Sequence, residues 1–593
     1  MLRRLLQDWW RRLRGGTTPG ADALALYREG VVLGQNNRFD EAEACYRRAL
    51  ALDPCLAEAY NNLGRIDELR GRNADAAQCY EHAIECKPRL PHPYINLGNL
   101  LQRRNDLDAA CERYDAALLL DPGSWEAQNN RANVLLERGE HTAARAAFAA
   151  AVKVRPDDPV AASNKLNCEI FALASSPGEL VAEYKNWARR FAAPLAGEFP
   201  EHTNIPDPQR RLRIGYVSPD FRKHAMGYFI EPLLEFHNRD AFDLYCYSNW
   251  PRPDAMTARF KALAPHWRDI ALLRDADVAK QIAGDGIDLL VDLAGHTADN
   301  RLLTFARKPA PVQFTYLGYP NTTGVDAIDY RITDRYTDPP GMTEGHYVEH
   351  LLRLPDCMWC YRAPEYMPEV GALPARACGH ITYGSFNGFL KVTESVIDTW
   401  AQLLDGVPEA RLIMITVARG EAQRRVRAAF AARGIDPERL ELHPKLPVDD
   451  YLALRNRVDI ALDPFPCNGG TTTCDSLWMG VPTVTLEGSM FVSRAGASLL
   501  TNVGLPELVA RSAGEYVAIA AGLAGDLPRL ESLRAGLRER MRASPLCDAP
   551  RFVANLEHLY REAWQTWCAG HGAAGNHDGR AHPAQDTAVP TSS

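Results

Sequence analysis

The stretch VDIALDPFPCNGGTTTCDSLWMGVPTVTL, residues 458–486, places a loop of glycine and threonine between two apolar runs rich in β-branched residues. The flanking runs are typical of buried strands, and the segment after the loop is typical of a helix. A strand, a small-residue loop and a helix in this order direct backbone N–H groups and the positive end of a helix toward an anion, usually a phosphate. The stretch therefore predicts an α/β fold with a phosphate-binding loop within residues 467–480.

The loop lacks the lysine of a nucleoside-triphosphate loop, and no G-x-x-x-x-G-K-[ST] motif occurs in the chain. An ATPase is therefore not the natural interpretation. The net charge of −8 and the pI near 6.1 argue against general binding of nucleic acid, because phosphate backbones are held by clustered Lys and Arg. The loop alone does not indicate which phosphate-containing ligand it binds, so the rest of the chain has to be considered.

The 593 residues, with 46% apolar content, predict about three or four domains. The 14 cysteines show no framework of pairs and we recognise no secretory leader, which favours a reducing cytoplasm. Cys357 and Cys360 form a C-x-x-C without a second pair or a nearby ligand histidine, so packing thiols are a better interpretation than a zinc site. No apolar run approaches the ~20 residues of a membrane-spanning helix.

The two ends of the chain have distinct compositions. Residues 1–14 place six large apolar side chains on one helical face and five arginines elsewhere, so an amphipathic helix is predicted at 1–20. It could lie on an anionic membrane surface, but a capping helix for the helices that follow is the favoured interpretation. Residues 569–593 have no periodic apolar pattern and are predicted to be disordered.

Several columns of residues recur at a step of 34 in the first part of the chain. They hold proline, an aromatic residue, alanine twice, and glycine: Pro54, Pro88, Pro122 and Pro156; Tyr46, Tyr80, Tyr114 and Phe148; Ala42, Ala76, Ala110 and Ala144; Ala49, Ala83, Ala117 and Ala151; Gly30, Gly64, Gly98 and Ala132. Small residues where two helices cross, an aromatic that fills the gap and a proline that ends the second helix are what stacked helix-turn-helix units require. The columns predict about four tetratricopeptide repeats at 21–158.

Asn62, Asn96 and Asn130 share the same step in the first helix of successive units. A side-chain amide can pair with both the N–H and the C=O of an extended backbone, so a ladder of asparagines could hold an acceptor peptide whatever its sequence. The alternative is that each asparagine only bonds a neighbouring helix, and spacing alone does not separate the two. Such arrays bind peptides, build scaffolds or hold a neighbouring domain.

After a helical linker at 159–205, short β-rich runs alternate with amphipathic helices. Strands are predicted at 212–217, 242–248, 287–293 and 311–317 in a first lobe (206–375), and at 381–387, 410–416, 439–445, 458–463 and 482–486 in a second lobe (376–568). Each set predicts a mostly parallel sheet covered by helices. Ligands of such sheets bind beyond the carboxyl ends of the strands, in a cleft if two such domains lie side by side.

Polar loops follow four of these predicted strands. His224 and His296 each follow a strand of the first lobe. In the second lobe, Lys391 follows the first strand, and the glycine-threonine loop follows the strand at 458–463. A single histidine at a strand end is more often structural than catalytic. Four polar loops at equivalent strand ends favour a functional site instead.

Six ordered stretches carry a resemblance to a known family: GYVSPDF (215–221) with His224, LVDLAGHT (290–297), KPAPVQFTYLGYPNTTG (308–324), DYRITD (329–334), GSFNGFLK (384–391) and CNGGTTTCDSLWMGVPTVT (467–485). They resemble the O-linked N-acetylglucosamine transferases and their SPINDLY-type relatives. The resemblance implies an α + α/β chain, with tetratricopeptide repeats ahead of a two-lobed, metal-independent GT-B transferase that has two Rossmann-like domains. Members move a sugar from a nucleotide diphosphate to Ser or Thr hydroxyls.

The resemblance also implies roles for single residues. Lys391 would contact the diphosphate, Thr471 and Thr472 would hold the phosphates at the helix start, and Asp475 would lie in the nucleotide pocket. His224 would stand beside the acceptor as a base or a positioning group. The other residues expected at the nucleotide sugar are Asn387, Tyr451, Asn468, Gly469, Gly470 and His296.

Departures from the animal enzymes leave two donors open. Ala283, Tyr451 and Gly470 stand where those enzymes place histidines. The Gly-His-Thr with His296, LGYPNTTG (317–324) and LPDCMWCY (354–361) resemble the SPINDLY type, whose plant members use GDP-fucose. The Cys-Asn-Gly-Gly-Thr-Thr loop with Asp475 resembles the enzymes that use UDP-N-acetylglucosamine, and this is the donor we expect.

We therefore expect a protein O-glycosyltransferase without cofactor or metal, acting in the cytoplasm on acceptor proteins that lie along the repeats. A repeat scaffold without activity is the alternative, and an isolated cation such as Lys391 facing a phosphate loop argues against it. Asp275 and Asp277 form an Asp-x-Asp, as in metal-dependent transferases, but the motif opens a predicted helix and is better explained by capping.

Overall fold

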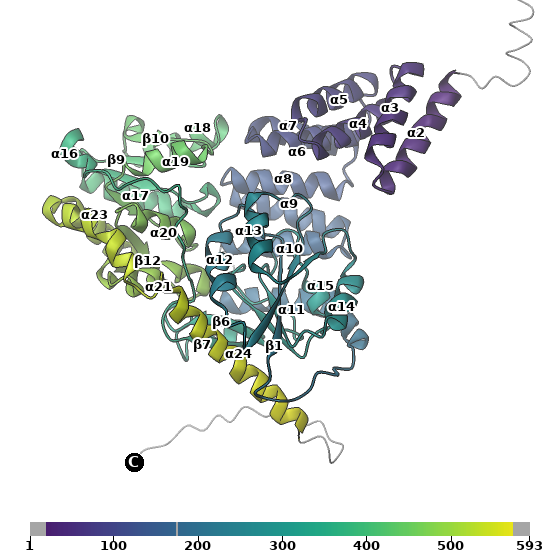
Figure 1. The fold of residues 1–593 in the computed structure, drawn as a ribbon. Coiled ribbons are helices and arrows are strands. Elements are labelled where there is room, and N and C mark those ends of the chain that lie inside the picture. Colours follow the sequence, from purple (N-terminus) through teal and green to yellow (C-terminus); the bar gives the residue numbers. More distant parts are fainter. Residues whose placement is uncertain (1–18, 173–175, 573–593) are drawn as a thin grey trace, which may run out of the picture. The chain divides into compact units, whose positions relative to one another are not determined.

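The computed structural model describes residues 19–172 and 176–572 (Figure 1). These residues divide into two compact units. One unit joins residues 1–183 to 365–541, and the other joins 184–364 to 542–593. Each unit contains its own parallel sheet. The helix predicted at 1–20 and the tail predicted at 569–593 lie mostly outside the described residues.

The first unit opens with pairs of helices, and each pair is one repeat. The pairs are α2 (Pro19–Gln35) with α3 (Phe39–Leu52), α4 (Ala57–Leu69) with α5 (Asn73–Cys86), α6 (Pro91–Arg103) with α7 (Leu107–Leu120), and α8 (Trp125–Glu137) with α9 (His141–Val154). Helix α10 (Pro159–Ala172) packs on α9, and α11 (Pro177–Phe191) leads into the other unit. Each proline of the predicted column lies just beyond the end of a second helix, so the predicted repeats are confirmed.

The glycine and tyrosine columns meet inside each repeat. A Cβ atom built on Gly30 would lie 2.6 Å from Cε1 of Tyr46, which is only 3% exposed. The same close approach recurs, at 2.7 and 2.6 Å, between Gly64 and Tyr80 and between Gly98 and Tyr114. Since real Cβ atoms do not approach so closely, the two helices of a repeat can pack this tightly only around glycine. The fourth repeat carries Ala132 and Phe148 at these positions.

The second unit is built on a seven-stranded parallel sheet of order β3-β2-β1-β4-β5-β6-β7. Its strands are β1 (Leu212–Ser218), β2 (Phe242–Ser248), β3 (His266–Asp269), β4 (Leu289–Asp292), β5 (Val312–Thr315), β6 (Tyr330–Asp334) and β7 (His350–Leu354). Its connecting elements are η1 (Ala193–Glu198), α12 (Gly227–Phe236), α13 (Ala255–Leu263), α14 (Asp275–Gly284), α15 (Leu302–Phe305) and η2 (Glu344–His346). All residues of β4 and β5 are buried, as expected for inner strands of a parallel sheet that is covered on both faces.

Helix α24 (Ala549–Gly572) belongs to this second unit, although it follows the second lobe in sequence. The hydroxyl of Tyr560 lies 3.2 Å from that of Tyr216 on β1, and the indole N–H of Trp564 donates to the carbonyl oxygen of Asp207 at 2.9 Å. The structure therefore differs from the predicted second lobe of 376–568. A helical periodicity shows that α24 has an apolar face but not which sheet that face covers.

The first unit continues with a six-stranded parallel sheet of order β10-β9-β8-β11-β12-β13. Its strands are β8 (Thr382–Ser385), β9 (Arg411–Met414), β10 (Leu440–Leu442), β11 (Ile460–Leu462), β12 (Thr483–Leu486) and β13 (Val509–Ala510). The chain steps outward from β8 to β10 and then crosses back, so that β11 lies beside β8. This crossing makes a switch point, the place where doubly wound sheets bind ligands.

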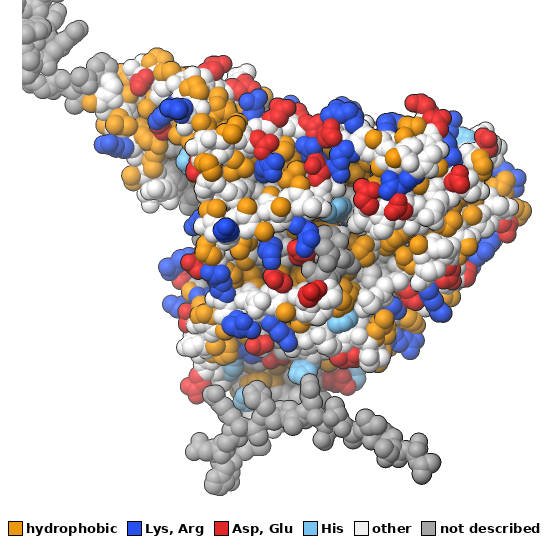
Figure 2. All heavy atoms as spheres, turned by 180° about the vertical axis from the view of Figure 1, so that it is seen from behind, with side chains coloured by type: hydrophobic (Ala, Val, Ile, Leu, Met, Phe, Trp, Pro, Cys, Tyr) orange, Lys and Arg blue, Asp and Glu red, His pale blue; other side chains and the backbone are white. Residues whose placement is uncertain are grey.

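Helices and short 3-10 turns connect these strands. They are α16 (Pro374–Cys378), η3 (Phe389–Lys391), α17 (Glu394–Gly406), α18 (Glu421–Ala431), η4 (Pro437–Arg439), α19 (Val448–Arg455), α20 (Thr471–Trp478), η5 (Phe491–Ser493), α21 (Ala495–Asn502), η6 (Pro506–Leu508), α22 (Ala513–Ala524) and α23 (Leu527–Arg542). Within the described part of the chain, no helix has both the length and the apolar content needed to cross a membrane. Acidic and basic side chains are interspersed on the face in Figure 2.

The glycine column can be tested with two positions on helix α2. We expect Gly30→Ala to destabilise the first repeat by about 1–3 kcal/mol, because the buried ring of Tyr46 would have to shift. Gly34 is the matched control, since a Cβ there would lie 3.8 Å from the nearest atom, and Gly34→Ala should stabilise the helix by about 0.5–1 kcal/mol. Amide hydrogen exchange in α2 and α3 measures both effects. Equal protection in the two variants would contradict the packing described here.

Candidate functional site

The loops after β8 and β11 bring the predicted phosphate-binding residues together at the switch point of the first unit. The amide of Asn387, after β8, connects the two loops. Its Nδ2 donates to Oδ1 of Asp463 at 3.3 Å, and its Oδ1 accepts from the hydroxyl of Thr472 at 2.9 Å. Hydrogen bonds shared in this way polarise and rigidify one another. The switch point therefore holds one connected polar cluster.

Asp463 lies at the centre of this cluster and is only 1% exposed. One carboxylate oxygen accepts from the backbone N–H of Gly469 at 2.7 Å, and the other accepts from the hydroxyl of Thr485 at 2.7 Å. Burial raises the pKa of Asp463 to about 6, although these hydrogen bonds and the nearby charge of Lys391 act to lower it. The carboxylate thus ties the loop after β11 to strand β12.

The ammonium of Lys391, at the end of η3, points into the same cluster. Its Nζ donates to the carbonyl oxygen of Asn468 at 2.7 Å and lies 3.5 Å from Oδ1 of Asn387. The side chain of Asn468 is buried and donates to the carbonyl oxygen of Pro464 at 3.2 Å, which steadies the loop that Lys391 contacts. Both of these acceptors are neutral, so neither of them forms an ion pair with the ammonium.

The glycine-threonine loop leads directly into helix α20. Gly470 precedes the helix and has no side chain to cap its first N–H groups. Such a helix start offers free donors and a positive dipole end to an anion. Gly469 is required by close packing, because a Cβ there would overlap Oγ1 of Thr472 and lie 3.0 Å from Oδ1 of Asp463. Thr471 and Thr472, at the start of α20, are both partly exposed.

Arg455, on α19, connects the two residues predicted for the nucleotide pocket. Its guanidinium carbon lies 4.4 Å from the ring centre of Phe386 and 4.6 Å from that of Tyr451. It donates to the hydroxyl of Tyr451, and its other contacts include Oδ2 of Asp475 at 3.5 Å. A planar guanidinium can stack on rings and donate hydrogen bonds at the same time. Arg455 therefore fixes Tyr451 and Asp475 relative to each other.

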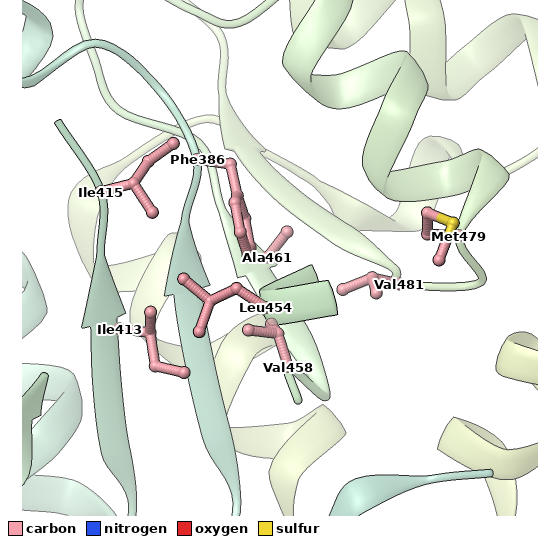
Figure 3. Packing of buried hydrophobic residues seen from close by; sticks show 8 residues of the cluster. All are labelled: Phe386, Ile413, Ile415, Leu454, Val458, Ala461, Met479 and Val481. Carbon is pink, nitrogen blue, oxygen red and sulfur yellow. The ribbon is translucent and has the colours of Figure 1, made fainter. Parts of the chain in front are cut away.

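Beneath the site residues lies one buried apolar cluster, and two of its members adjoin site residues in sequence (Figure 3). Its members are Phe386, Ile413, Ile415, Leu454, Val458, Ala461, Met479 and Val481. Phe386 precedes Asn387, and Leu454 precedes Arg455. Tyr451 packs against the same cluster. Side chains locked in a dense core hold their neighbours in place, which is what a preorganised site needs.

His224 lies in the second unit, in the loop after β1, with 38% of its side chain exposed. Its Nδ1 lies 3.4 Å from Oδ1 of Asp220 and 3.4 Å from the backbone nitrogen of Met226. Partial burial lowers the pKa of His224, and Asp220 opposes the change while Arg222 adds to it. The imidazole is therefore mostly neutral at pH 7.

His296 has very different surroundings in the same unit. It is fully buried, and its Nε2 lies 2.8 Å from the carbonyl oxygen of Thr323. Its ring lies 4.7 Å from that of Trp187 and 5.2 Å from that of Tyr184, both on helix α11. Burial lowers its pKa to about 4. The structure thus encloses His296 among aromatic side chains and does not bring it to a surface.

The asparagine column forms hydrogen bonds from one repeat to the next. Nδ2 of Asn96 donates to Oδ1 of Asn61, and Nδ2 of Asn130 donates to Oδ1 of Asn99, each at 2.8 Å. Asn62 makes a longer bond, 3.4 Å, to a tyrosine hydroxyl of the preceding repeat. Such bonds are what the alternative interpretation expects, in which each asparagine bonds a neighbouring helix. All three side chains are only partly buried, and an amide has two donor hydrogens and an acceptor, so capacity for a peptide remains.

Three residues of these arrangements were not predicted. Asn164 lies one further step of 34 along the column, inside the predicted linker, and donates to Asn129 at 2.9 Å. Extending the column would have found it. Asp463 is a carboxylate that ends an apolar strand just before the loop, which is a usable signal. Arg455 has no such signal, because only the fold brings it to Asp475.

The fold and the site define a class of protein. The chain carries tetratricopeptide repeats followed by two doubly wound parallel sheets, with a cation and a glycine-rich helix start at the switch point of the second sheet. This is the GT-B architecture of glycosyltransferases.

More particularly, the chain belongs to glycosyl transferase family 41, whose model matches residues 195–367 and 369–556. A tetratricopeptide repeat model matches residues 27–91 and 95–159. Together with the relatives and the solved structure reported next, these matches confirm the resemblance to the O-linked N-acetylglucosamine transferase and SPINDLY family.

Known proteins similar to the chain carry consistent names. The chain is 43% identical over 403 residues to a Petunia hybrida protein named probable UDP-N-acetylglucosamine-peptide N-acetylglucosaminyltransferase SPINDLY, covering 67% of this chain and 43% of that protein. An Arabidopsis thaliana protein with the same activity name and the name SEC is 32% identical over 373 residues, with 61% and 38% covered. The chain spans less than half the length of these relatives.

A solved structure matches over most of the chain. It is a mutant of the Thermobaculum terrenum O-GlcNAc transferase, with a TM-score of 0.82 and 38% identity. The match covers 87% of this chain and 98% of that one. The match is therefore long enough to include both the repeats and the two sheets.

The buried carboxylate of Asp463 predicts a pH-dependent stability. Its pKa in the folded chain, about 6, lies above its ordinary value of 3.8, so the native carboxyl holds its proton more tightly than the unfolded one. This contribution to stability is complete below the ordinary pKa and is lost as the pH rises through about 6. Between pH 4 and pH 7, the wild type should therefore lose up to about 3 kcal/mol relative to Asp463→Asn. Urea unfolding across this range measures the difference, and a difference independent of pH would contradict the assignment.

Proposed function

We propose that the chain is a protein O-glycosyltransferase that transfers N-acetylglucosamine from UDP-N-acetylglucosamine to Ser and Thr hydroxyls. The observation that carries the proposal is the cluster in which Lys391, Asn387 and Thr472 meet beside the start of helix α20. Such a cluster suits a diphosphate. Membership of family 41 and the names of the relatives support the same reaction.

In the proposed reaction, the acceptor oxygen bonds to the anomeric carbon of the sugar while the bond from that carbon to the diphosphate oxygen breaks. The departing diphosphate gathers negative charge, and fixed donors aimed at that charge lower the barrier. Lys391 would supply the cation, and Thr471 and Thr472 would supply hydroxyl and amide donors at the positive end of α20. With this cation in place, we propose that no metal ion is needed.

On the acceptor side, we propose that His224 accepts the hydroxyl proton or orients the hydroxyl. Its lowered pKa favours the neutral, basic form at pH 7. Acceptor proteins would lie along the repeats, where Asn62, Asn96 and Asn130 keep part of their hydrogen-bonding capacity. His296 is left out of the proposed donor site, because its side chain is fully buried.

Asn468, Gly469 and Gly470 would form the backbone of the phosphate-binding loop, while Tyr451 and Asp475 would face the nucleoside. The reaction would take place in the cytoplasm, in agreement with the free thiols of the described cysteines.

GDP-fucose is the second candidate donor. The chain is more similar to the relatives named SPINDLY, at 41–43% identity, than to the one named SEC, at 32%, and it shares sequence motifs with the SPINDLY type. Tyr451 could stack on either base, because stacking gives affinity without choosing one. Discrimination requires hydrogen bonds to the edges of the base, and we propose Asp475 for them, a buried carboxylate that also contacts Arg455.

The role of Lys391 can be tested by removing its charge. We expect Lys391→Ala to lower turnover by about 10²–10³, the loss that follows removal of one strong donor to a developing anion. The fold should stay intact, because Lys391 is only partly buried. Lys153→Ala is the control, since Lys153 is an exposed lysine on repeat helix α9. Near-normal turnover by a folded Lys391→Ala variant would refute the role.

The donor can be identified by titrating UDP and GDP separately into the purified chain, in the presence of EDTA. We expect UDP to bind and GDP to bind far more weakly, because a site with hydrogen bonds to one base leaves polar groups unpaired with the other. Binding should survive the chelator if Lys391 takes the place of a metal. Tight GDP binding without UDP binding would make GDP-fucose the donor instead of UDP-N-acetylglucosamine. A requirement for added metal would contradict the proposal that Lys391 alone supplies the cation.

A further inference from the structure

The turn that carries Lys391 is held by groups outside its own loop. The hydroxyl of Thr416 accepts from the backbone N–H of Phe389 at 2.7 Å and donates to the carbonyl oxygen of Asn387 at 3.2 Å. Thr416 has a φ of 60°, a left-handed conformation that β-branched residues rarely adopt. The backbone is thus strained at Thr416, in the position that lets its hydroxyl bond this turn.

The fourth tetratricopeptide repeat supplies the second support. Gly139, in the loop between α8 and α9, has a φ of +72°, and a Cβ there would lie 2.8 Å from Cε1 of Phe389. His141, the first residue of α9, places Nε2 2.7 Å from the carbonyl oxygen of Leu390. Because a carbonyl oxygen only accepts, the imidazole must donate from Nε2.

Other contacts fix the repeat loop itself against the lobe. Arg425, on α18, donates to the carbonyl oxygens of Arg138 at 3.0 Å and Gly139 at 3.3 Å. The carboxylate of Asp108, on α7, accepts from the backbone N–H of Glu421 at 2.9 Å. A carboxylate at this position caps the start of α18, although it comes from a repeat helix far away in sequence. The loop at 138–140 and His141 beside it are therefore held against α18 and are not chance neighbours of the turn.

We propose that His141 is a positioning residue for Lys391. By holding the carbonyl oxygen of Leu390, it fixes the peptide plane that leads to Lys391 and so the place where the ammonium meets the diphosphate. This inference rests on the proposed function of Lys391. It gives the repeat array a role on the donor side of the reaction, in addition to the presentation of acceptors.

The geometry of the peptide bond carries the argument. The carbonyl of Leu390 and the N and Cα of Lys391 lie in one plane, because the peptide bond does not rotate freely. A hydrogen bond that sets the direction of this carbonyl therefore sets the origin of the lysine side chain. A displacement of about 1 Å in a positioning group can cost about 100-fold in rate.

Three variants test the inference. His141→Ala removes the donor, His141→Gln keeps an N–H that can reach the carbonyl, and His92→Ala changes an exposed histidine in the first turn of repeat helix α6. Each is made with Lys391 intact and with Lys391→Ala. Two rates are measured in every protein: transfer to an acceptor protein, and hydrolysis of the nucleotide sugar without acceptor. The affinity for UDP is measured alongside.

We expect His141→Ala to lower transfer and hydrolysis together by about 10-fold and to leave the KM for the acceptor unchanged. His141→Gln should stay within about 3-fold of the wild type, and His92→Ala should match it. In the Lys391→Ala background, His141→Ala should cause no further loss, because two residues that act through one group are not additive.

Two outcomes would overturn the role of His141. An equal loss in both backgrounds would show that the imidazole supports the fold in general, and a loss of transfer without a loss of hydrolysis would show that it serves acceptor presentation. Failure of the proposed function looks different: it is normal turnover by Lys391→Ala itself, or UDP affinity that is the same with and without the lysine.

Discussion

The buried carboxylate of Asp463 is the constraint on which the site depends. A charge that is 1% exposed has lost its water, so neighbouring groups have to replace those hydrogen bonds. They come from Gly469 in the loop before α20, from Thr485 on β12 and from Asn387 after β8. Satisfying one carboxylate therefore fixes three segments at once. Gly496 leaves room for this arrangement, because a Cβ there would lie 2.9 Å from Oδ2 of Asp463.

Both sheets have a buried aspartate at the carboxyl end of an equivalent strand, β4 in one and β11 in the other. Asp292 ends β4 as Asp463 follows β11, and burial raises the pKa of each to about 6. Asp292 accepts from the hydroxyl of Thr315 on the next strand at 2.9 Å and from the backbone N–H of Gly295 at 2.9 Å, in the same manner as Asp463. The loops that follow differ in what they present. In one unit the loop turns His296 into the core, and in the other it opens into the glycine-threonine helix start.

How far the sequence predicts the structure depends on the distance over which each contact acts. The repeats could be predicted because each column reflects packing within one or two neighbouring units. Four strands were missed, β3, β6, β7 and β13, and three of these lie at sheet edges. Polar residues interrupt the apolar runs of β3 and β7, and β13 has only two residues. In the site, the order of strand, loop and helix along the sequence was sufficient to predict the phosphate-binding loop. The bond from His141 to Leu390 joins residues 249 apart, and no local pattern marks such a pair.

The contacts between repeats and lobe have a consequence for how the length of the array can change. The hydrogen bonds described above start from Asp108 on α7, from the loop at 138–140 and from His141 on α9. Each earlier repeat joins its neighbour through packing of the same kind, and stability in such arrays is a sum of units and nearest-neighbour interfaces. Whole units of 34 residues could therefore be added or removed ahead of α6 without moving the turn under Lys391. The array is extensible at one end and fixed in register at the other.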